Sequence, residues 1–124
     1  MSTRLAGRPP APAAASPLAD AIARLQRDLE AVRARPALAP RTAKLLSEGV
    51  PKMAKKVGEE AVELALDAVG GDRRAIVAEA ADLVYHLIVL LDALGIDSAE
   101  VAEEMDRRRG LMGIAEKLPK PGAR

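Results

Sequence analysis

The chain of 124 residues contains no cysteine, no tryptophan and no phenylalanine, and it has a single tyrosine and a single histidine. Without cysteine, disulfide bonds and thiolate metal sites are excluded, so oxygen atoms or His86 would have to hold any metal ion. Without aromatic bulk, the core must consist of alanine, leucine and valine, which favours closely packed helices over a β-sandwich. Such a core buries little area per residue, so we expect an oligomer interface to add to it.

The chain also lacks an excess of charge of either sign and any long apolar run. Its net charge is +1 with 30% charged residues, a balance that argues against a dedicated nucleic-acid-binding protein. No apolar run approaches the roughly 18 residues that a membrane span needs. The N-terminal segment is broken by Pro9, Pro10 and Pro12 and does not look like a signal peptide. We therefore expect a cytoplasmic protein without membrane or nucleic-acid partners.

The length of the chain fits one domain. Residues 1–16 are rich in proline, alanine, glycine and arginine, which predicts a flexible tail. We expect residues 17–118 to form one all-α domain and residues 119–124 to form a flexible C-terminus. Ser16-Pro17 is typical of a helix start, with serine as the N-cap and proline at the first helical position. This helix should end near Arg35, because the residue before a proline avoids the helical region. Residues 36–40 are predicted to form a linker.

Glycines and capping residues predict where the other helices begin and end. Asp72 and Asp97 are expected N-caps, and Glu100 completes a capping box with Asp97. Together with the first helix, this predicts an all-α bundle of four to five helices, the further ones at 42–47, 51–69, 73–94 and 98–109. The first helix carries a narrow apolar seam of Leu18, Ile22, Leu25, Leu29 and Val32.

The acidic residues of two successive helices form the most informative pattern. Glu59, Glu60 and Glu63 read E-E-x-x-E, and Glu79 and Asp82 read E-x-x-D on the next helix. Residues three apart lie about 60° apart around a helix axis and one turn along it. Glu60 therefore pairs with Glu63, and Glu79 with Asp82. The two pairs can face each other if the helices are antiparallel across Gly70-Gly71.

These carboxylates have a simpler interpretation as solvated surface charges, which helical geometry disfavours. Glu60 lies at the edge of its helix's apolar stripe, Glu63 just beyond it, and Glu59 points nearly away; this stripe is Met53, Val57, Ala61, Leu64 and Ala68. Glu79 and Asp82 lie in the same way beside the stripe of the next helix, which is Ile76, Ala80, Leu83, Leu87, Leu90 and Leu94. Four carboxylates at the margin of a core would repel one another and lose hydration unless a cation compensated them.

A set of oxygen ligands without thiolate suits Mg²⁺, with Mn²⁺ as a substitute. Magnesium usually binds through a few carboxylates together with substrate phosphates. The cluster therefore predicts a phosphorylated substrate, with a nucleotide polyphosphate as the natural candidate. The metal would neutralise phosphate charge, hold the attacking water and stabilise the leaving pyrophosphate.

Two lysines and the histidine accompany the cluster. Lys56 precedes Glu60 by four residues and has two open interpretations, a surface ion pair or a contact to a substrate phosphate. For Lys52, a surface position is favoured over a phosphate contact. His86 follows Asp82 by four residues and is either a structural residue or an accessory group that contacts a carboxylate or substrate.

Three stretches of the sequence resemble the phosphoribosyl-ATP pyrophosphatases of histidine biosynthesis. They are T-A-K-L-L-S-E-G-V-P-K-M-A-K-K-V-G-E-E-A-V-E (42–63), E-A-A-D-L-V-Y-H-L-I-V-L-L (79–91) and R-R-G-L-M-G-I-A-E-K (108–117). The acidic pattern alone is shared with MazG-like and dimeric dUTPase-like pyrophosphohydrolases. The first two stretches in combination are far more specific.

The resemblance implies a MazG-like all-α fold completed by homo-oligomerisation, at least as a dimer. It also implies Mg²⁺-dependent cleavage of the α–β phosphate bond of phosphoribosyl-ATP, giving phosphoribosyl-AMP and pyrophosphate. Matched by position, Glu59 and Glu60 would be catalytic, and Lys56, with Lys52, would contact phosphate. The implied metal ligands are Glu60, Glu63, Glu79 and Asp82.

Two alternatives remain open at this stage. One is a MazG-like enzyme for another (d)NTP, because Pro40-Arg41 replaces the serine and aromatic residue that this family usually has there. The other is a non-catalytic dimerisation module that pairs through the apolar seam of the first helix. The second alternative leaves the four carboxylates at the core margin unexplained.

Overall fold

The computed structural model describes residues 16–112. It contains five α-helices and one short 3-10 helix in that range, and no strand, which confirms the all-α class. The elements are α1 (Pro17–Ala34), η2 (Pro36–Leu38), α2 (Pro40–Ser47), α3 (Val50–Gly70), α4 (Arg73–Ala93) and α5 (Ser98–Met112). The tails predicted at 1–16 and 119–124 lie outside the described residues, apart from Ser16. The predicted domain, 17–118, is described as far as residue 112.

Side-chain caps begin three of the helices as predicted. The Ser16 hydroxyl accepts a hydrogen bond from the Ala19 amide at 3.4 Å, and the Asp72 carboxylate accepts one from the Arg74 amide at 3.1 Å. At α5, the Asp97 carboxylate accepts from the Ala99 amide at 2.8 Å, while the Glu100 carboxylate accepts from the Asp97 amide at 3.0 Å. This reciprocal pair is the predicted capping box.

Two predicted boundaries are wrong. The segment predicted as a linker at 36–40 contains η2, and α2 already begins at Pro40, because proline is well suited to the first helical position. The last helix was predicted to end at Gly110, but α5 continues to Met112. Glycine inside a helix weakens it by about 1 kcal/mol without stopping it. Gly71 does end α3, because it adopts a φ of 86°.

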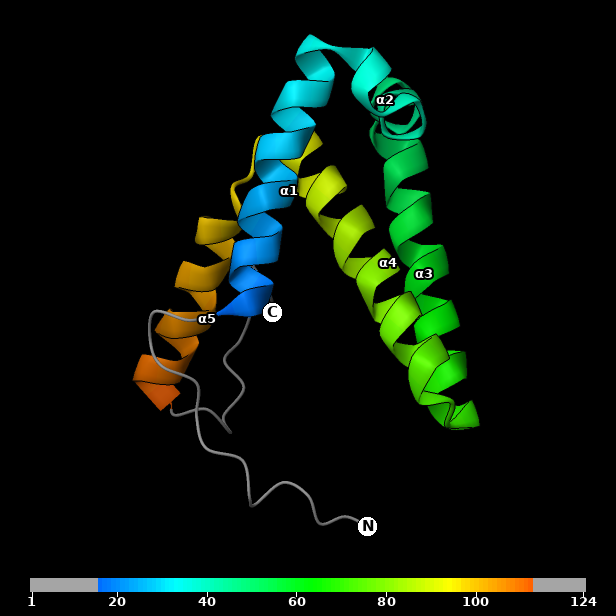
Figure 1. Cartoon of the computed structure of the whole chain (residues 1–124). Coiled ribbons are helices and arrows are strands. Elements are labelled where there is room, and N and C mark those ends of the chain that lie inside the picture. Colours follow the sequence, from blue (N-terminus) through cyan, green and yellow to red (C-terminus); the bar gives the residue numbers. More distant parts are fainter. Residues whose placement is uncertain (1–15, 113–124) are drawn as a thin grey trace.

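Helices α3 and α4 form an antiparallel hairpin; they lie close together near the turn that joins them and diverge toward the other end of the hairpin (Figure 1). Met53 and Glu60 are buried, and Val57, Leu64 and Asp67 are half-buried. These five residues follow one another at spacings of four and three, so they form one seam toward α4. The predicted stripe was wrong at Ala61 and Ala68, which are exposed. Glu60 therefore lies within the seam and not at its edge.

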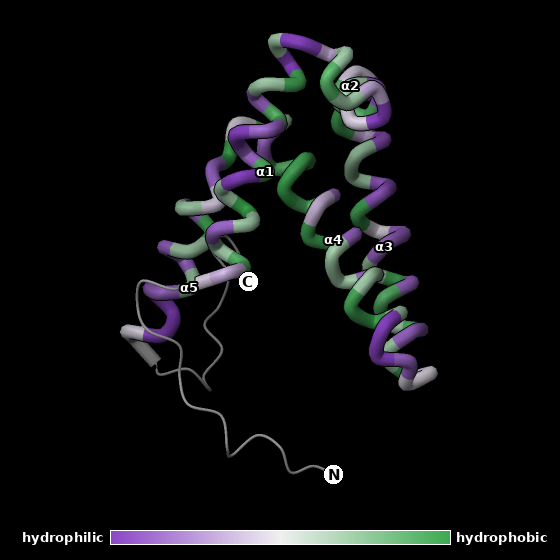
Figure 2. The backbone as a smooth tube through the Cα atoms, viewed as in Figure 1, coloured by the Kyte–Doolittle hydropathy of each residue, from purple (hydrophilic) through white to green (hydrophobic). Residues whose placement is uncertain are grey.

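Helix α4 packs against α1 as well as α3, so it buries two faces. The core consists of Leu29 from α1, Met53 from α3, and Ile88 and Val89 from α4. Leu87 and Leu94, which were predicted to be core residues, are 38% and 49% exposed. The apolar residues of α4 thus extend around more of the helix than the two neighbours cover. Figure 2 colours much of α4 green, the colour of hydrophobic residues.

Polar contacts fix α1 on the rest of the bundle. Leu29 and Val32 of the predicted α1 seam are buried, Ile22 and Leu25 are half-buried, and Leu18 is exposed. Arg33 forms an ion pair with Asp92 near the end of α4, and the Ser98 hydroxyl at the start of α5 donates to Gln26 at 3.2 Å. Within residues 16–112, no helix is both long enough and apolar enough to cross a membrane.

Candidate metal centre

The α3–α4 hairpin brings three acidic side chains together. Glu60 projects from the seam of α3 toward α4, where Glu79 and Asp82 lie one turn apart. One carboxylate oxygen from each of the three lies within 4.8 Å of the others. The cluster forms because the short turn at Gly71 makes the two helices antiparallel at the register that the sequence pattern predicts.

Two of the predicted acidic residues lie at the margin of this group. Glu63 is exposed and is not among the three clustered side chains, although its charge acts on Glu79. Glu59 is exposed on α3 and forms an ion pair with Lys56 at 3.6 Å. The structure thus gathers three of the four carboxylates predicted to be metal ligands, while the fourth contributes through electrostatics.

Burial makes the cluster electrostatically unfavourable as it stands. Glu60 is only 8% exposed, and the Oε1 atom of Glu79 is enclosed without a hydrogen-bond partner among the described residues. A hydrogen bond with Glu60, burial, and the charges of Glu63, Glu60 and Asp82 together raise the pKa of Glu79 to about 7. The charged form of the Glu79 carboxylate is therefore disfavoured, and a bound proton or cation would compensate its negative charge.

The donor set fits a small divalent cation. All three groups are carboxylates, which Mg²⁺ and Mn²⁺ prefer, and the enclosed Glu79 oxygen points to a missing positive partner. Asp82 is exposed while Glu60 is buried, so the cluster is open on one side. An open side leaves room for water and substrate phosphates, which magnesium sites usually retain.

The predicted lysines and histidine make specific contacts. The Lys56 ammonium pairs with Glu59 and not with Glu60, and Lys52 is exposed at the start of α3. The Nδ1 atom of His86 lies 2.9 Å from the backbone carbonyl oxygen of Asp82, so this ring atom does not contact a carboxylate. Among residues 16–112, the one ion pair that Lys56 forms is therefore with an acidic residue at the margin of the cluster, Glu59.

Sequence reasoning missed one polar contact between α4 and α2. The hydroxyl groups of Tyr85 and Thr42 lie 2.7 Å apart and join α4 to α2. A signal was present, because a tyrosine in a buried environment usually requires a partner for its hydroxyl. Thr42, 43 residues earlier in the chain, could not be identified as that partner without the fold.

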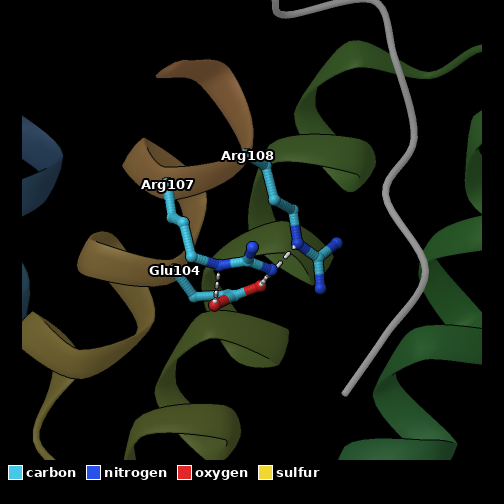
Figure 3. Close-up of polar contacts among 3 residues, drawn as sticks. All are labelled: Glu104, Arg107 and Arg108. Carbon is cyan, nitrogen blue, oxygen red and sulfur yellow. Dashed lines mark hydrogen bonds and ion pairs between the residues drawn. The ribbon is translucent and has the colours of Figure 1, made fainter. Parts of the chain in front are cut away.

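A separate charge cluster lies on α5. Arg107 donates two hydrogen bonds to Glu104, at 3.0 and 2.7 Å, and Arg108 donates one at 3.0 Å (Figure 3). The hydrogen bonds from Arg107 and Arg108 lower the pKa of Glu104 to about 2. These three side chains compensate one another within one helix, which explains them without a ligand.

Comparison with known proteins agrees with the geometry. The profile of the phosphoribosyl-ATP pyrophosphohydrolase family matches residues 22–109. Phosphoribosyl-ATP pyrophosphatase 2 of Rhodopseudomonas palustris is 48% identical over 103 residues, covering 83% of this chain and 79% of that protein. Phosphoribosyl-ATP pyrophosphatase of Rhizorhabdus wittichii is 50% identical over 93 residues, covering 73% and 88%. The chain therefore belongs to the phosphoribosyl-ATP pyrophosphohydrolase family.

Proposed function

We propose that this chain hydrolyses phosphoribosyl-ATP to phosphoribosyl-AMP and pyrophosphate in histidine biosynthesis, with Mg²⁺ as the cofactor. One observation carries the chemistry: three carboxylates from α3 and α4 converge, and an enclosed oxygen of Glu79 lacks a partner. The family match supplies the substrate class. Bound at this cluster, Mg²⁺ would neutralise phosphate charge and lower the pKa of a coordinated water.

The chain's own residues have distinct roles in this proposal. Glu60, Glu79 and Asp82 hold the cation, and Glu63 is retained as a fourth ligand because it lies one turn beyond Glu60. Glu59 and Glu60 are the proposed catalytic acids that orient the attacking water. Lys56 and the more distant Lys52 bind substrate phosphate. For Lys56 this requires exchange of its Glu59 ion pair for the phosphate, which is feasible because both side chains reach solvent.

The proposal includes a homo-oligomer, at least a dimer. An apolar seam on α4 is only partly covered by α1 and α3, and Val77, Leu87 and Leu94 in it are 61%, 38% and 49% exposed. Its members are spaced alternately by three and four residues, which is the pattern of a helix–helix interface; they are Val77, Ala80, Val84, Leu87, Leu91 and Leu94. An apolar groove of about 430 Å³ between α1 and α4 adjoins this seam. The expected cytoplasmic location belongs to the same proposal.

The function is tested by measuring pyrophosphate release with Mg²⁺ from phosphoribosyl-ATP and from a panel of NTPs and dNTPs. We expect rapid release from phosphoribosyl-ATP, with formation of phosphoribosyl-AMP. Release only from other nucleotides would retain the carboxylate site but reassign the substrate, and Pro40-Arg41 would then be the first positions to exchange. Release from none of them would overturn the enzymatic proposal in favour of a helical dimerisation module.

A further inference from the structure

Tyr85, the only aromatic side chain outside the histidine ring, joins α4 to α2. Its hydroxyl lies 2.7 Å from the hydroxyl of Thr42, so α4 is hydrogen-bonded to α2 across 43 residues of sequence. Both groups are half-buried, which makes an unsatisfied hydroxyl unfavourable. The contact restrains the Tyr85 ring, because its far end is fixed to a second helix.

The restrained Tyr85 ring lies against the only histidine in the chain. The ring centroids of Tyr85 and His86 are 4.9 Å apart and the rings are nearly perpendicular, at 87°. This edge-to-face arrangement is a preferred geometry for ring pairs. Glu79, Asp82 and His86 follow one another at spacings of three and four residues, so the three side chains leave α4 on the same side.

The hydrogen bond of His86 identifies which ring nitrogen carries the proton. Nδ1 lies 2.9 Å from the Asp82 carbonyl oxygen, and a carbonyl oxygen can only accept. Nδ1 must therefore donate, and Nε2 of the neutral ring is a hydrogen-bond acceptor. Within residues 16–112, no protein group forms a hydrogen bond with Nε2. The ring is thus held at one nitrogen and open at the other.

We propose that Thr42 and Tyr85 are positioning residues that hold the His86 ring so that Nε2 accepts a hydrogen bond from a water molecule beside Asp82. The two contacts act in series: Thr42 restrains Tyr85, and Tyr85 restrains His86. Without them, the imidazole can turn about its side-chain torsions and is restrained only by the Nδ1 hydrogen bond. The inference rests on the proposed hydrolase function, because it assigns the ordered water to that reaction.

The imidazole can be observed directly, since one histidine gives one set of side-chain NMR signals. We expect the ¹⁵N shifts of the neutral wild-type ring to show a protonated Nδ1 and an unprotonated Nε2. In Thr42→Val and in Tyr85→Phe, which remove one hydroxyl each, we expect these signals to broaden or move toward the average of both tautomers. Signals that are the same in both variants as in the wild type would overturn the inference.

Kinetics test whether the two hydroxyl groups act as one unit. We expect each variant to lower kcat for phosphoribosyl-ATP by roughly two- to tenfold, the effect of one lost hydrogen bond, with little change in KM. The double variant should lose no more than either single variant, and Thr42→Ser should restore kcat. In a His86→Gln background, Tyr85→Phe should have no further effect. Additive losses, or an effect that persists without His86, would contradict the positioning role.

A matched control removes a different hydroxyl from the same helix. Ser47 is exposed on α2 and donates to the Lys44 carbonyl at 2.7 Å, without contact to Tyr85. Ser47→Ala should leave both the imidazole signals and kcat unchanged. The NMR readout does not need hydrolysis, so the two failures are distinguishable: an inactive wild type overturns the proposed function, whereas unchanged imidazole signals in an active enzyme overturn this inference alone.

Discussion

The surroundings of Glu79 in the folded chain favour the protonated form of its side chain. Its pKa rises from 4.5 to about 7 through the hydrogen bond with Glu60, burial, and the neighbouring charges of Glu63, Glu60 and Asp82. Between these two pH values the folded chain binds more protons than the unfolded chain, so the free energy of unfolding falls as the pH rises. The stabilisation is fully present below pH 4.5 and is lost as the pH passes about 7.

This fall in the free energy of unfolding with rising pH gives a prediction for the metal-free protein. We expect the contribution of Glu79 to the free energy of unfolding to decrease from pH 4.5 to 7, and Glu79→Gln to remove that dependence. Because a cation compensates the charged form, added Mg²⁺ should raise the stability more at pH 7.5 than at pH 5. Urea denaturation of both proteins at these pH values measures the effect. A wild-type profile that matches Glu79→Gln would contradict it.

The cluster also predicts which carboxylates matter for turnover. Replacing Glu60 by Gln or Asp82 by Asn removes a ligand charge but keeps the side-chain shape. Loss of a group that only hydrogen-bonds to a metal ligand typically lowers metal affinity or activity by roughly 10- to 100-fold. We expect turnover to fall by more than this, because these substitutions change the ligands themselves. The matched control is Glu103→Gln, since Glu103 is exposed on α5.

Steady-state kinetics and circular dichroism together decide this prediction. Folded variants of Glu60 and Asp82 with near-wild-type turnover would show that the cluster is not the metal centre. An equal loss in Glu103→Gln would show that the effect comes from net charge and not from the cluster.

At the scale of residues, the acidic pattern in the sequence predicted that carboxylates of two helices could meet, but not which of the side chains converge. Spacing predicted that Glu60, Glu79 and Asp82 could meet, and the structure brings them together. Spacing could not separate Glu63 from them, because the angle between residues three apart says nothing about where a flexible side chain ends. The Tyr85–Thr42 hydrogen bond depends on the tertiary arrangement of α2 and was beyond sequence reasoning.

At the scale of elements, the α3–α4 turn determines whether the carboxylates face each other. Gly71 adopts a φ of 86°, in the left-handed region, and its amide donates to the Asp67 carbonyl at 3.0 Å. A residue with a Cβ in that region is strained by about 1–2 kcal/mol. We therefore expect Gly71→Ala to lower the stability by about that amount and to weaken Mg²⁺ binding.

The neighbouring glycine provides the control for this prediction. Gly70 is the last residue of α3, and a Cβ added there would meet nothing within 4 Å. Gly70→Ala should be neutral or stabilise the helix, by up to about 1 kcal/mol. Chemical denaturation of both variants makes the comparison, and equal effects at the two positions would contradict the role of the left-handed conformation.

Helix α5 has its own pH-dependent element. The pKa of Glu104 is lowered from 4.5 to about 2 by hydrogen bonds from Arg107 and Arg108 (Figure 3). The stabilisation is present above pH 4.5 and is lost as the pH falls toward 2, the opposite direction to that of Glu79. We expect Glu104→Gln to reduce the amide protection of α5 at pH 6 but not at pH 2. Hydrogen exchange measures this, and equal protection in both proteins at pH 6 would refute it.

At the scale of the whole molecule, composition and periodicity were enough to predict an all-α bundle, and α1, α3 and α4 begin and end within a few residues of the predicted positions. What could not be predicted is which apolar face of α4 each neighbour covers. A helix that is apolar around most of its circumference has no single stripe, so Ile88 and Val89 were missed as core residues and Leu87 and Leu94 were wrongly included.

The partly covered α4 seam leads to a prediction of assembly. We expect the protein to be a dimer or a larger homo-oligomer in solution, and Leu87→Glu to shift it toward the monomer, because a charge would be buried at a helix–helix contact. The melting temperature of the wild type should rise with protein concentration, as it does for associating chains. Analytical ultracentrifugation measures the mass, and a wild type that is monomeric at all concentrations would contradict the proposed assembly.

The most direct test of the central claim is the rate of pyrophosphate release from phosphoribosyl-ATP as a function of Mg²⁺ concentration. We predict no release in the presence of a chelator, saturable activation by Mg²⁺, and phosphoribosyl-AMP as the second product. Release that is insensitive to chelation, or no release at saturating Mg²⁺, would contradict the assignment of Glu60, Glu79 and Asp82 as the metal centre of a phosphoribosyl-ATP pyrophosphohydrolase.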